Sequence, residues 1–332
     1  MRVLEHSKRS VSVDDIREAQ GRISGETIRT PLVLGAAASD RAGCPVYLKL
    51  ENFQRTGSFK VRGALNTVMS VTPGERAKGL ICASSGNHGL GVAYAARRFG
   101  SQCTVVLPEN PNPLKRSFLQ KLGAHIVEFG TNSDMQWEKV QQLSHEYGYT
   151  QVHPFSDPEI IAGQGTIGLE ILEDLAEVDE IYVPIGGGGL ISGIALAIKE
   201  LNPQVRVYGV EPERSNAIAE SVREGKPVVL PRVETIADGL AAKTTGSLNL
   251  SIIRRCLDEI ILVSDWDILR ATLFLLEQGK VLVEPSAAAS FAGLLANSKR
   301  EGRVVAVLSG GNVTLDQLSQ LQSRLEGATS GV

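Results

Sequence analysis

Short apolar runs alternate with amphipathic segments along most of this chain, and this alternation limits the folds open to it more than any other feature. The runs of strand length are Leu80–Ala83, Cys103–Leu107, residues 124–129, Glu180–Pro184, residues 205–211, Glu259–Val263 and Val304–Leu308. Continuous apolar strands separated by amphipathic helices are typical of parallel sheets with helices on both faces. We therefore predict an α/β fold built from doubly wound parallel sheets.

Helices are predicted where apolar residues recur at three- and four-residue spacing. The first begins after Ser12, because Asp14 and Asp15 place two acids in its first turn. The predicted helices cover residues 12–24, 91–99, 113–122, 134–146, 190–201 and 217–224, and another begins at Asp265. The proline-rich residues 108–113 are interpreted as a loop.

The composition excludes several classes of protein. A length of 332 residues is sufficient for two domains. The net charge of -3 gives no basic surface for nucleic acid or an anionic membrane. No apolar stretch reaches the ~18 residues of a membrane span, and the N-terminus lacks an apolar signal core. The four cysteines show no CxxC spacing, as expected for free thiols in a reducing compartment. We predict a cytoplasmic protein that acts on a small molecule.

One lysine stands at a predicted strand-to-helix junction. The apolar run Val46–Leu50 leads through a polar turn to Lys60, and a helical pattern follows with Val61, Leu65 and Val68. An amine in a partly dry pocket loses part of its preference for the charged form, so it can act as a nucleophile, a Schiff-base former or a base. The alternative is an exposed surface lysine, which is the commoner situation.

A polar segment at residues 84–89, Ser-Ser-Gly-Asn-His-Gly, follows one predicted strand and opens a helix. Backbone N–H groups and small hydroxyls at a helix N-terminus suit an anion such as a carboxylate. The alternative is a serine N-cap with a glycine turn. His88 could titrate near neutral pH during catalysis, but we favour a structural role in holding the loop.

A run of glycines at residues 186–189 lies between another predicted strand and helix. Backbone amides without side chains at a helix N-terminus form a phosphate site. The run does not fit the G-x-G-x-x-G dinucleotide motif, and no Lys-Ser or Lys-Thr follows it as in a Walker A loop. Glu211, at the end of the next strand, occupies the place of a ribose-binding acid, which keeps an NAD-binding alternative open.

Residues 51–64 read Glu-Asn-Phe-Gln-Arg-Thr-Gly-Ser-Phe-Lys-Val-Arg-Gly-Ala. This segment resembles the lysine signature of the threonine dehydratase and serine racemase family, whose members are pyridoxal phosphate (PLP) enzymes of fold type II. The resemblance implies two parallel-sheet domains with the cofactor between them. By the same resemblance, residues 1–70 and 154–332 are expected to form the large cofactor-binding domain and residues 71–153 a small inserted α/β domain. No C-terminal regulatory domain is expected, since 20 residues follow Asn312.

The resemblance also implies roles for individual residues. The catalytic residues are Lys60, which holds the cofactor covalently and removes the α proton, and Ser85, which stands where racemases carry a second acid/base group. The cofactor-binding residues are Lys60, Phe59, Asn87 at the phenolic oxygen, Gly186, Gly187, Gly188 and Gly189 at the phosphate, Ser309 at the pyridine nitrogen, and Glu284. The substrate-binding residues are Ser84, Ser85, Asn87, His88 and Gly239.

The implied reaction is β-elimination of water from threonine or serine, which yields a 2-oxo acid and ammonia. A hydroxyl such as that of Ser309 need not protonate the pyridine ring, and the weaker electron sink favours elimination over a long-lived carbanion. Serine racemase and 3-hydroxyaspartate dehydratase are the alternatives, although the sequence offers no clear cation for a distal carboxylate. A PLP-binding protein without turnover and an NAD-linked oxidoreductase are the alternatives from other classes.

A metal site and the assembly are less constrained by the sequence. The racemase branch binds a divalent cation through acids after a Glu-Pro pair equivalent to Glu211 and Pro212. Here Ser215, Asn216 and Ala217 supply no second carboxylate at that spacing, although Glu213 lies close by. Glu211 is therefore the candidate ligand, and the sequence does not require a divalent cation. Because members of the family are commonly dimers or tetramers, we predict a homodimer or homotetramer.

Overall fold

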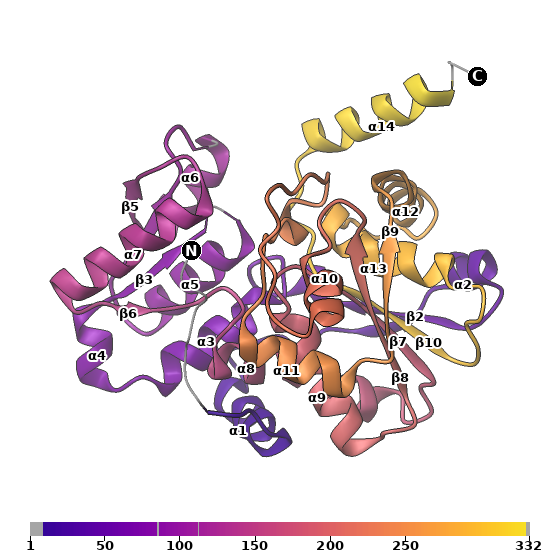
Figure 1. Ribbon diagram of the computed structural model, residues 1–332, viewed down its shortest axis with the longest axis horizontal. Helices are drawn as coiled ribbons and strands as arrows, with labels where there is room; N and C mark the ends of the chain where they lie inside the picture. The colour runs from indigo at the N-terminus through magenta and orange to yellow at the C-terminus, as the bar shows by residue number, and fades with distance from the viewer. Residues whose placement is uncertain (1–8, 85, 112, 330–332) are drawn as a thin grey trace.

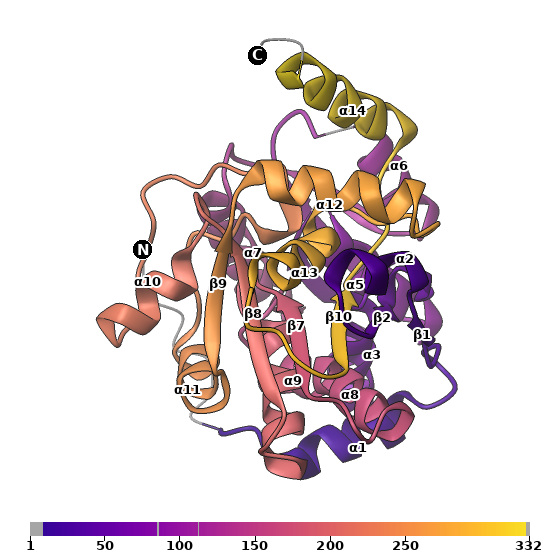
Figure 2. The same cartoon turned by 90° about the vertical axis from the view of Figure 1, so that its right-hand side faces the viewer.

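Two separate sheets organise the computed structural model, which describes residues 9–84, 86–111 and 113–329. The larger sheet has six strands in the order β1-β2-β10-β7-β8-β9, which can be followed across Figure 2. All neighbouring pairs in it are parallel except β1 with β2. Its strands are β1 (Leu32–Leu34), β2 (Val46–Leu50), β7 (Glu180–Pro184), β8 (Arg206–Pro212), β9 (Glu259–Val263) and β10 (Val304–Leu308).

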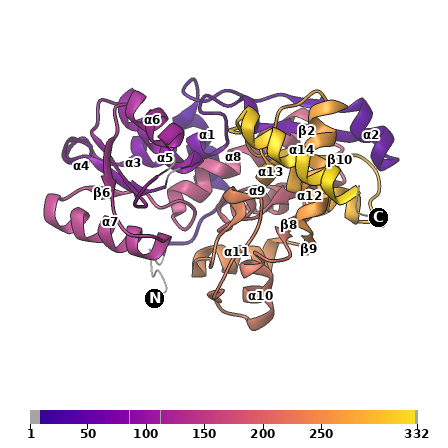
Figure 3. The ribbon, with the colours of Figure 1, turned by 90° about the horizontal axis from the view of Figure 1, so that it is seen from above.

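The smaller sheet has four parallel strands in the order β5-β4-β3-β6 and occupies the left of Figure 1. Its strands are β3 (Leu80–Ala83), β4 (Cys103–Leu107), β5 (His125–Glu128) and β6 (Thr150–Gln151). Seen from above in Figure 3, this sheet and α4 to α7 lie at one end of the molecule, and the larger sheet lies at the other.

Helices cover both sheets, as expected for parallel strands that are apolar along their whole length. The helices are α1 (Val13–Ile23), α2 (Ala36–Ala42), α3 (Lys60–Ser70), α4 (Pro73–Lys78), α5 (Asn87–Arg98), α6 (Pro113–Lys121), α7 (Ser133–Tyr147), α8 (Pro158–Asp174), α9 (Gly189–Leu201), α10 (Ala217–Glu224), α11 (Ser247–Cys256), α12 (Asp265–Glu277), α13 (Pro285–Ala296) and α14 (Leu315–Thr329), with 3-10 turns η1 (Glu51–Phe53) and η2 (Asp238–Leu240).

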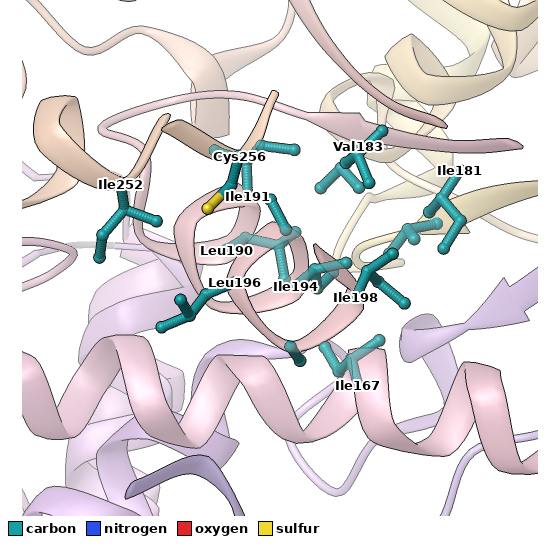
Figure 4. Packing of buried hydrophobic residues seen from close by; sticks show 14 of the residues in the cluster. Ile167, Ile181, Val183, Leu190, Ile191, Ile194, Leu196, Ile198, Ile252 and Cys256 are labelled. Carbon is teal, nitrogen blue, oxygen red and sulfur yellow. The ribbon is translucent and has the colours of Figure 1, made fainter. Parts of the chain in front are cut away.

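Close packing of α3, α8 and α9 depends on glycines. A Cβ added to Gly163 on α8 would lie 2.6 Å from the Cα of Gly63 on α3, and one added to Gly193 on α9 would lie 2.3 Å from a backbone oxygen of α8. Figure 4 shows Ile194 and Ile198 of α9 close to Ile167 of α8 in the apolar core. The helix that begins with Lys60 is therefore held against the centre of the molecule.

A buried group of charges holds the same helix from another side. Arg62 of α3 donates to both oxygens of Glu51, at 2.9 and 2.8 Å, and to both oxygens of Glu170 on α8, at 2.7 and 2.9 Å. Lys49 of β2 donates to Glu170 at 2.6 Å. All four side chains are buried. Two cations and two anions balance each other, so no net charge is left in the interior.

The predicted α/β fold with two parallel sheets is confirmed, and the predicted strands and helices are present with small shifts at their ends. The prediction missed α2, α4, α8, α11, α13 and α14 and the short strands β1 and β6. The domain limits at residues 71 and 153 stay a prediction. Cys44, Cys82, Cys103 and Cys256 are free thiols. None of the helices in the described ranges is both long and apolar enough to cross a membrane.

Candidate active site

A cleft of about 2520 Å³ receives residues from both sheets and their loops. Most of the site residues predicted from the sequence line this cleft: Phe59, Lys60, Ser84, Asn87, His88, Gly186, Gly187, Gly188, Gly189, Gly239, Glu284 and Ser309. Ser85 lies outside the described residues, and Glu211 does not line the cleft. The topology thus brings together predicted site residues from segments more than 200 positions apart.

Lys60 is the first residue of α3, and its amine faces the cleft. Its Nζ donates a hydrogen bond to the carbonyl oxygen of Pro154 at 2.7 Å and lies 5.2 Å from the centroid of the Phe59 ring. Burial lowers the pKa of Lys60 to about 8, although the charge of Glu284 acts in the opposite direction. A lysine with this pKa is more often neutral near pH 7 than an exposed one, as nucleophilic attack requires.

The end of β10 lies directly against the loop that carries Lys60. The backbone N–H of Phe59 donates to the carbonyl oxygen of Ser309 at 3.0 Å, and Ser58 forms a β-bridge with Gly310. Because β10 pairs with β2, the strand that leads into the Lys60 loop, the two loops emerge side by side at the same sheet edge. The buried Ser309 is thereby placed next to the lysine segment.

Asn87, the first residue of α5, reaches across to groups carried by the larger sheet. Its Nδ2 donates to Oε1 of Glu284 at 2.7 Å, and its Oδ1 accepts from Nδ2 of Asn312 at 2.7 Å. Glu284 precedes α13, and burial raises its pKa to about 7 while the Asn87 hydrogen bond acts in the opposite direction. The side chain of Asn87 is thus held between a carboxylate and a second amide.

The raised pKa of Glu284 predicts a pH-dependent contribution to stability. Between pH 4.5, its ordinary pKa, and about 7, the folded protein binds more of this proton than the unfolded chain does. This group's contribution is therefore fully present below pH 4.5 and is lost as the pH rises through about 7. We expect wild type to lose stability relative to Glu284→Gln over that interval, measured by urea unfolding of the cofactor-free protein. The control is Glu213→Gln, because Glu213 is exposed. A wild type that gains stability relative to Glu284→Gln as the pH rises over this range contradicts the raised pKa of Glu284.

The glycine run forms a turn between β7 and α9 that excludes side chains. Gly188 has a φ of 94°, a left-handed conformation that favours glycine. A Cβ on Gly187 would lie 2.2 Å from the Phe155 ring, and one on Gly189 would lie 2.9 Å from the Cα of Phe155. Thr245 donates to the carbonyl oxygen of Gly187 at 3.1 Å. The turn at the N-terminus of α9 therefore borders the cleft without side chains, and a helix N-terminus favours an anion.

His88 is buried, and its ring is held by the backbone. Its Nε2 donates to the carbonyl oxygen of Val152 at 2.9 Å. Burial lowers the pKa of His88 to about 3, and the charge of Lys60 acts in the same direction. A histidine that stays neutral at pH 7 is suited to the structural role and not to donating a proton.

Smaller contacts shape the rest of the cleft. Ser84 Oγ accepts from the backbone N–H of Gly86 at 3.2 Å, and the N–H of Gly239 donates to Oγ of Ser286 at 2.9 Å. The first contact is a local turn, and the second ties η2 to α13. Both loops are thus fixed by short polar bonds at the edge of the cleft.

Glu211 is engaged elsewhere. Its carboxylate accepts from the backbone N–H groups of Ile218 at 3.0 Å and Ala219 at 2.8 Å, at the start of α10. Within the described part of the chain, no three His, Cys, Asp or Glu side chains are grouped so that they could hold a metal ion. The prediction of a metal ligand at Glu211 therefore gains no support from its contacts.

Four residues with contacts at the site were given no role from the sequence. Pro154 supplies the acceptor for Lys60, Phe155 packs under the glycine run, and Asn312 contacts Asn87. Lys115 of α6, which lines the cleft, lies 3.6 Å from Asp238; the sequence alone did not place a lysine or arginine near a distal substrate carboxylate. A basic residue after the proline-rich loop was the signal available for Lys115; the other three depend on tertiary contacts.

These residues fit PLP by their own chemistry. A half-buried amine with a lowered pKa, a side-chain-free turn at a helix N-terminus and a buried serine all border one cleft. A family model described as pyridoxal-phosphate dependent enzyme matches residues 23–310. The chain belongs to this family.

Relatives of this PLP-dependent enzyme span nearly its whole length. The L-threonine ammonia-lyase of Thermotoga maritima is 41% identical over 94% of this chain and 78% of its own. The L-threo-3-hydroxyaspartate ammonia-lyase of Saccharomyces cerevisiae is 40% identical over 94% of this chain and 96% of its own. Among solved structures, maize serine racemase has a TM-score of 0.90 at 36% identity and covers 97% of this chain and 100% of that one. The predicted family, type II fold and enzyme class are confirmed.

Proposed function

We propose that this PLP-dependent enzyme is an ammonia-lyase that eliminates water from L-threonine or L-serine and yields a 2-oxo acid and ammonia. The observation that carries the proposal is the single cleft shared by Lys60, Asn87, the glycine run and Ser309. Relatives at about 40% identity that are named L-threonine ammonia-lyases support the substrate class.

The cofactor would be held by groups at three loops. The backbone amides of residues 186–189 suit its phosphate, Ser309 its ring nitrogen and Asn87 its phenolic oxygen. Bound PLP supplies an electron sink for negative charge at the α carbon of an attached amino acid. A serine hydroxyl beside the ring nitrogen keeps this sink modest, which favours elimination.

The chain's own residues would bind the substrate and move its protons. The N-terminus of α5, with Ser84 and Asn87 beside it, offers N–H and hydroxyl donors to the substrate carboxylate. Lys60, with a pKa of about 8, is matched to taking a proton from the α carbon near neutral pH. The neutral His88 beneath the loop keeps its shape without adding a charge.

The decisive experiment gives the purified, PLP-loaded protein L-threonine, L-serine, D-serine and L-threo-3-hydroxyaspartate in separate reactions. Oxo acid, ammonia and enantiomer are followed by NMR. We expect oxo acid and ammonia in equal amounts from L-threonine or L-serine, with little enantiomer. An enantiomer that accumulates faster than oxo acid contradicts the lyase assignment and makes the protein a racemase that depends on Ser85.

A hydroxyaspartate ammonia-lyase is the second candidate. Its support is the yeast relative together with Lys115, a cation that borders the cleft. The distal carboxylate of 3-hydroxyaspartate needs such a charge, although Asp238 beside Lys115 opposes a second anion. Turnover of this substrate above that of threonine identifies this activity.

Assembly and location complete the proposal. We propose a homodimer or homotetramer in the cytoplasm, as expected from the sequence. A divalent cation is not required by any contact described above. Sedimentation of the PLP-loaded protein with and without magnesium measures both the assembly and its response to the cation.

A further inference from the structure

We propose that Asn312 is a positioning residue that fixes the side-chain amide of Asn87 so that an N–H, and not an oxygen, faces the cofactor. The inference rests on the proposed function, in which Asn87 meets the phenolic oxygen of PLP. Asn312 lies four residues beyond the end of β10 and lines the cleft.

The side chain of Asn312 links three loops. Its Nδ2 donates to the carbonyl oxygen of Thr56 at 2.8 Å and to Oδ1 of Asn87 at 2.7 Å. Thr56 belongs to the loop before Lys60, Asn87 opens α5, and Asn312 follows the Ser309 segment. The Asn312 amide therefore connects the three loops that carry Lys60, Asn87 and Ser309.

The direction of this chain of hydrogen bonds is set by the backbone. The Thr56 carbonyl oxygen can only accept, so the NH₂ end of Asn312 must face it. The same NH₂ group reaches Asn87, whose oxygen must then point toward Asn312. This leaves the Asn87 NH₂ pointing the other way, with one N–H on Glu284 and the second N–H available to a ligand.

Close packing at Gly57 keeps Asn312 in place. Gly57 has a φ of 73°, and a Cβ added to it would lie 2.3 Å from Oδ1 of Asn312. The N–H of Gly311 donates to the carbonyl oxygen of Gly57 at 2.9 Å. The Asn312 side chain thus fills the space that the missing side chain leaves.

Glu284 alone would hold Asn87 less reliably. A carboxyl group with a pKa of about 7 is partly protonated at neutral pH, and its protonated form can donate to a flipped amide. Asn312 does not titrate, so it keeps the Asn87 oxygen turned away from the cofactor in either state. Because Asn312 is exposed to water, we expect its removal in Asn312→Ala to weaken PLP binding less than Asn312→Asp does, since Asn312→Asp puts an acceptor in place of the donor.

The experiment compares Asn312→Asp, Asn312→Ala, Asn87→Ala and the Asn87→Ala/Asn312→Ala double variant. Asn312→Asp keeps the shape but replaces the donor by an acceptor. The matched control is Asn52→Asp, a nearby residue whose Nδ2 donates to the carbonyl oxygen of Leu282 at 3.1 Å and not to Asn87. The Kd for PLP is titrated by absorbance, and the violet band of bound cofactor is recorded.

We expect Asn312→Asp to raise the Kd for PLP about tenfold and to weaken the violet band, and Asn312→Ala to raise the Kd about threefold. In the Asn87→Ala background, Asn312→Ala should change the Kd less than about twofold, because its effect passes through Asn87. Asn52→Asp should bind as wild type does.

Three results overturn the inference. The first is a Kd for PLP in Asn312→Asp equal to that of the wild type. The second is a rise in Kd in Asn52→Asp as large as that in Asn312→Asp. An effect of Asn312→Ala that persists undiminished without Asn87 shows that the residue only supports the loop. A wild-type protein that shows no violet band on addition of PLP instead overturns the proposed function, so the two failures are distinguishable.

Discussion

Replacing Lys60 by alanine is expected to lower the turnover of L-threonine at least about a thousandfold, because in the proposed function one side chain supplies both the covalent link to the cofactor and the base. The amine of Lys60 borders the cleft beside Phe59, and burial lowers its pKa to about 8. No other lysine is on α3, so a neighbouring amine cannot substitute from the same helix.

Two measurements check this expectation. Initial rates of oxo acid formation give the loss in kcat, and borohydride reduction followed by mass spectrometry locates covalently bound PLP. The control is Lys226→Ala, an exposed lysine that should leave both results unchanged. Full deaminase turnover by Lys60→Ala, or cofactor mass on a peptide without residue 60, contradicts the assignment.

Replacing Arg62 by leucine is expected to lower the free energy of unfolding by about 3–5 kcal/mol. The change removes a cation that donates to Glu51 and Glu170, and it leaves two buried carboxylates with Lys49 as the remaining cation of the group. An uncompensated buried charge costs far more than the loss of an exposed pair. Lys60 stands two residues away, so loosening of α3 should also weaken cofactor binding.

Guanidinium unfolding of the cofactor-free protein at pH 7 measures the effect. The control is Arg17→Leu, whose partner Asp14 is exposed on α1, and such surface pairs contribute about 0–1 kcal/mol. A midpoint for Arg62→Leu equal to that of Arg17→Leu contradicts the view that the buried charges hold α3 in place.

Most of the fold was predictable because its central strands, such as β4, β7 and β10, are runs of buried residues. Glu180–Pro184 and Val304–Leu308 begin and end where the apolar runs do. Helix α8 was missed although it has 17 residues, because residues 160–171 are all buried and show no polar face. A helix that is buried on every side has no solvent-facing polar stripe, so the alternation that marks an amphipathic helix is absent.

The site was predictable where its residues follow strands and resemble a known signature. Lys60, Asn87, the glycine run and Ser309 each open a loop or helix at the end of a strand, and all line the cleft. Partners chosen by tertiary structure were not predictable. Pro154 is 94 residues from Lys60, and Asn312 is 225 residues from Asn87, so no local pattern relates them.

The position of β10 has a consequence for biosynthesis. Although it is the last strand along the chain, β10 lies between β2 and β7 in the interior of the larger sheet. While residues 304–308 are still inside the ribosome, β2 and β7 lack the strand that pairs with both of them. Phe59 also lacks the Ser309 carbonyl oxygen that accepts its backbone hydrogen bond. Pairing over such long sequence separation is slow to form. The cleft can therefore be completed only after β10 has joined the larger sheet.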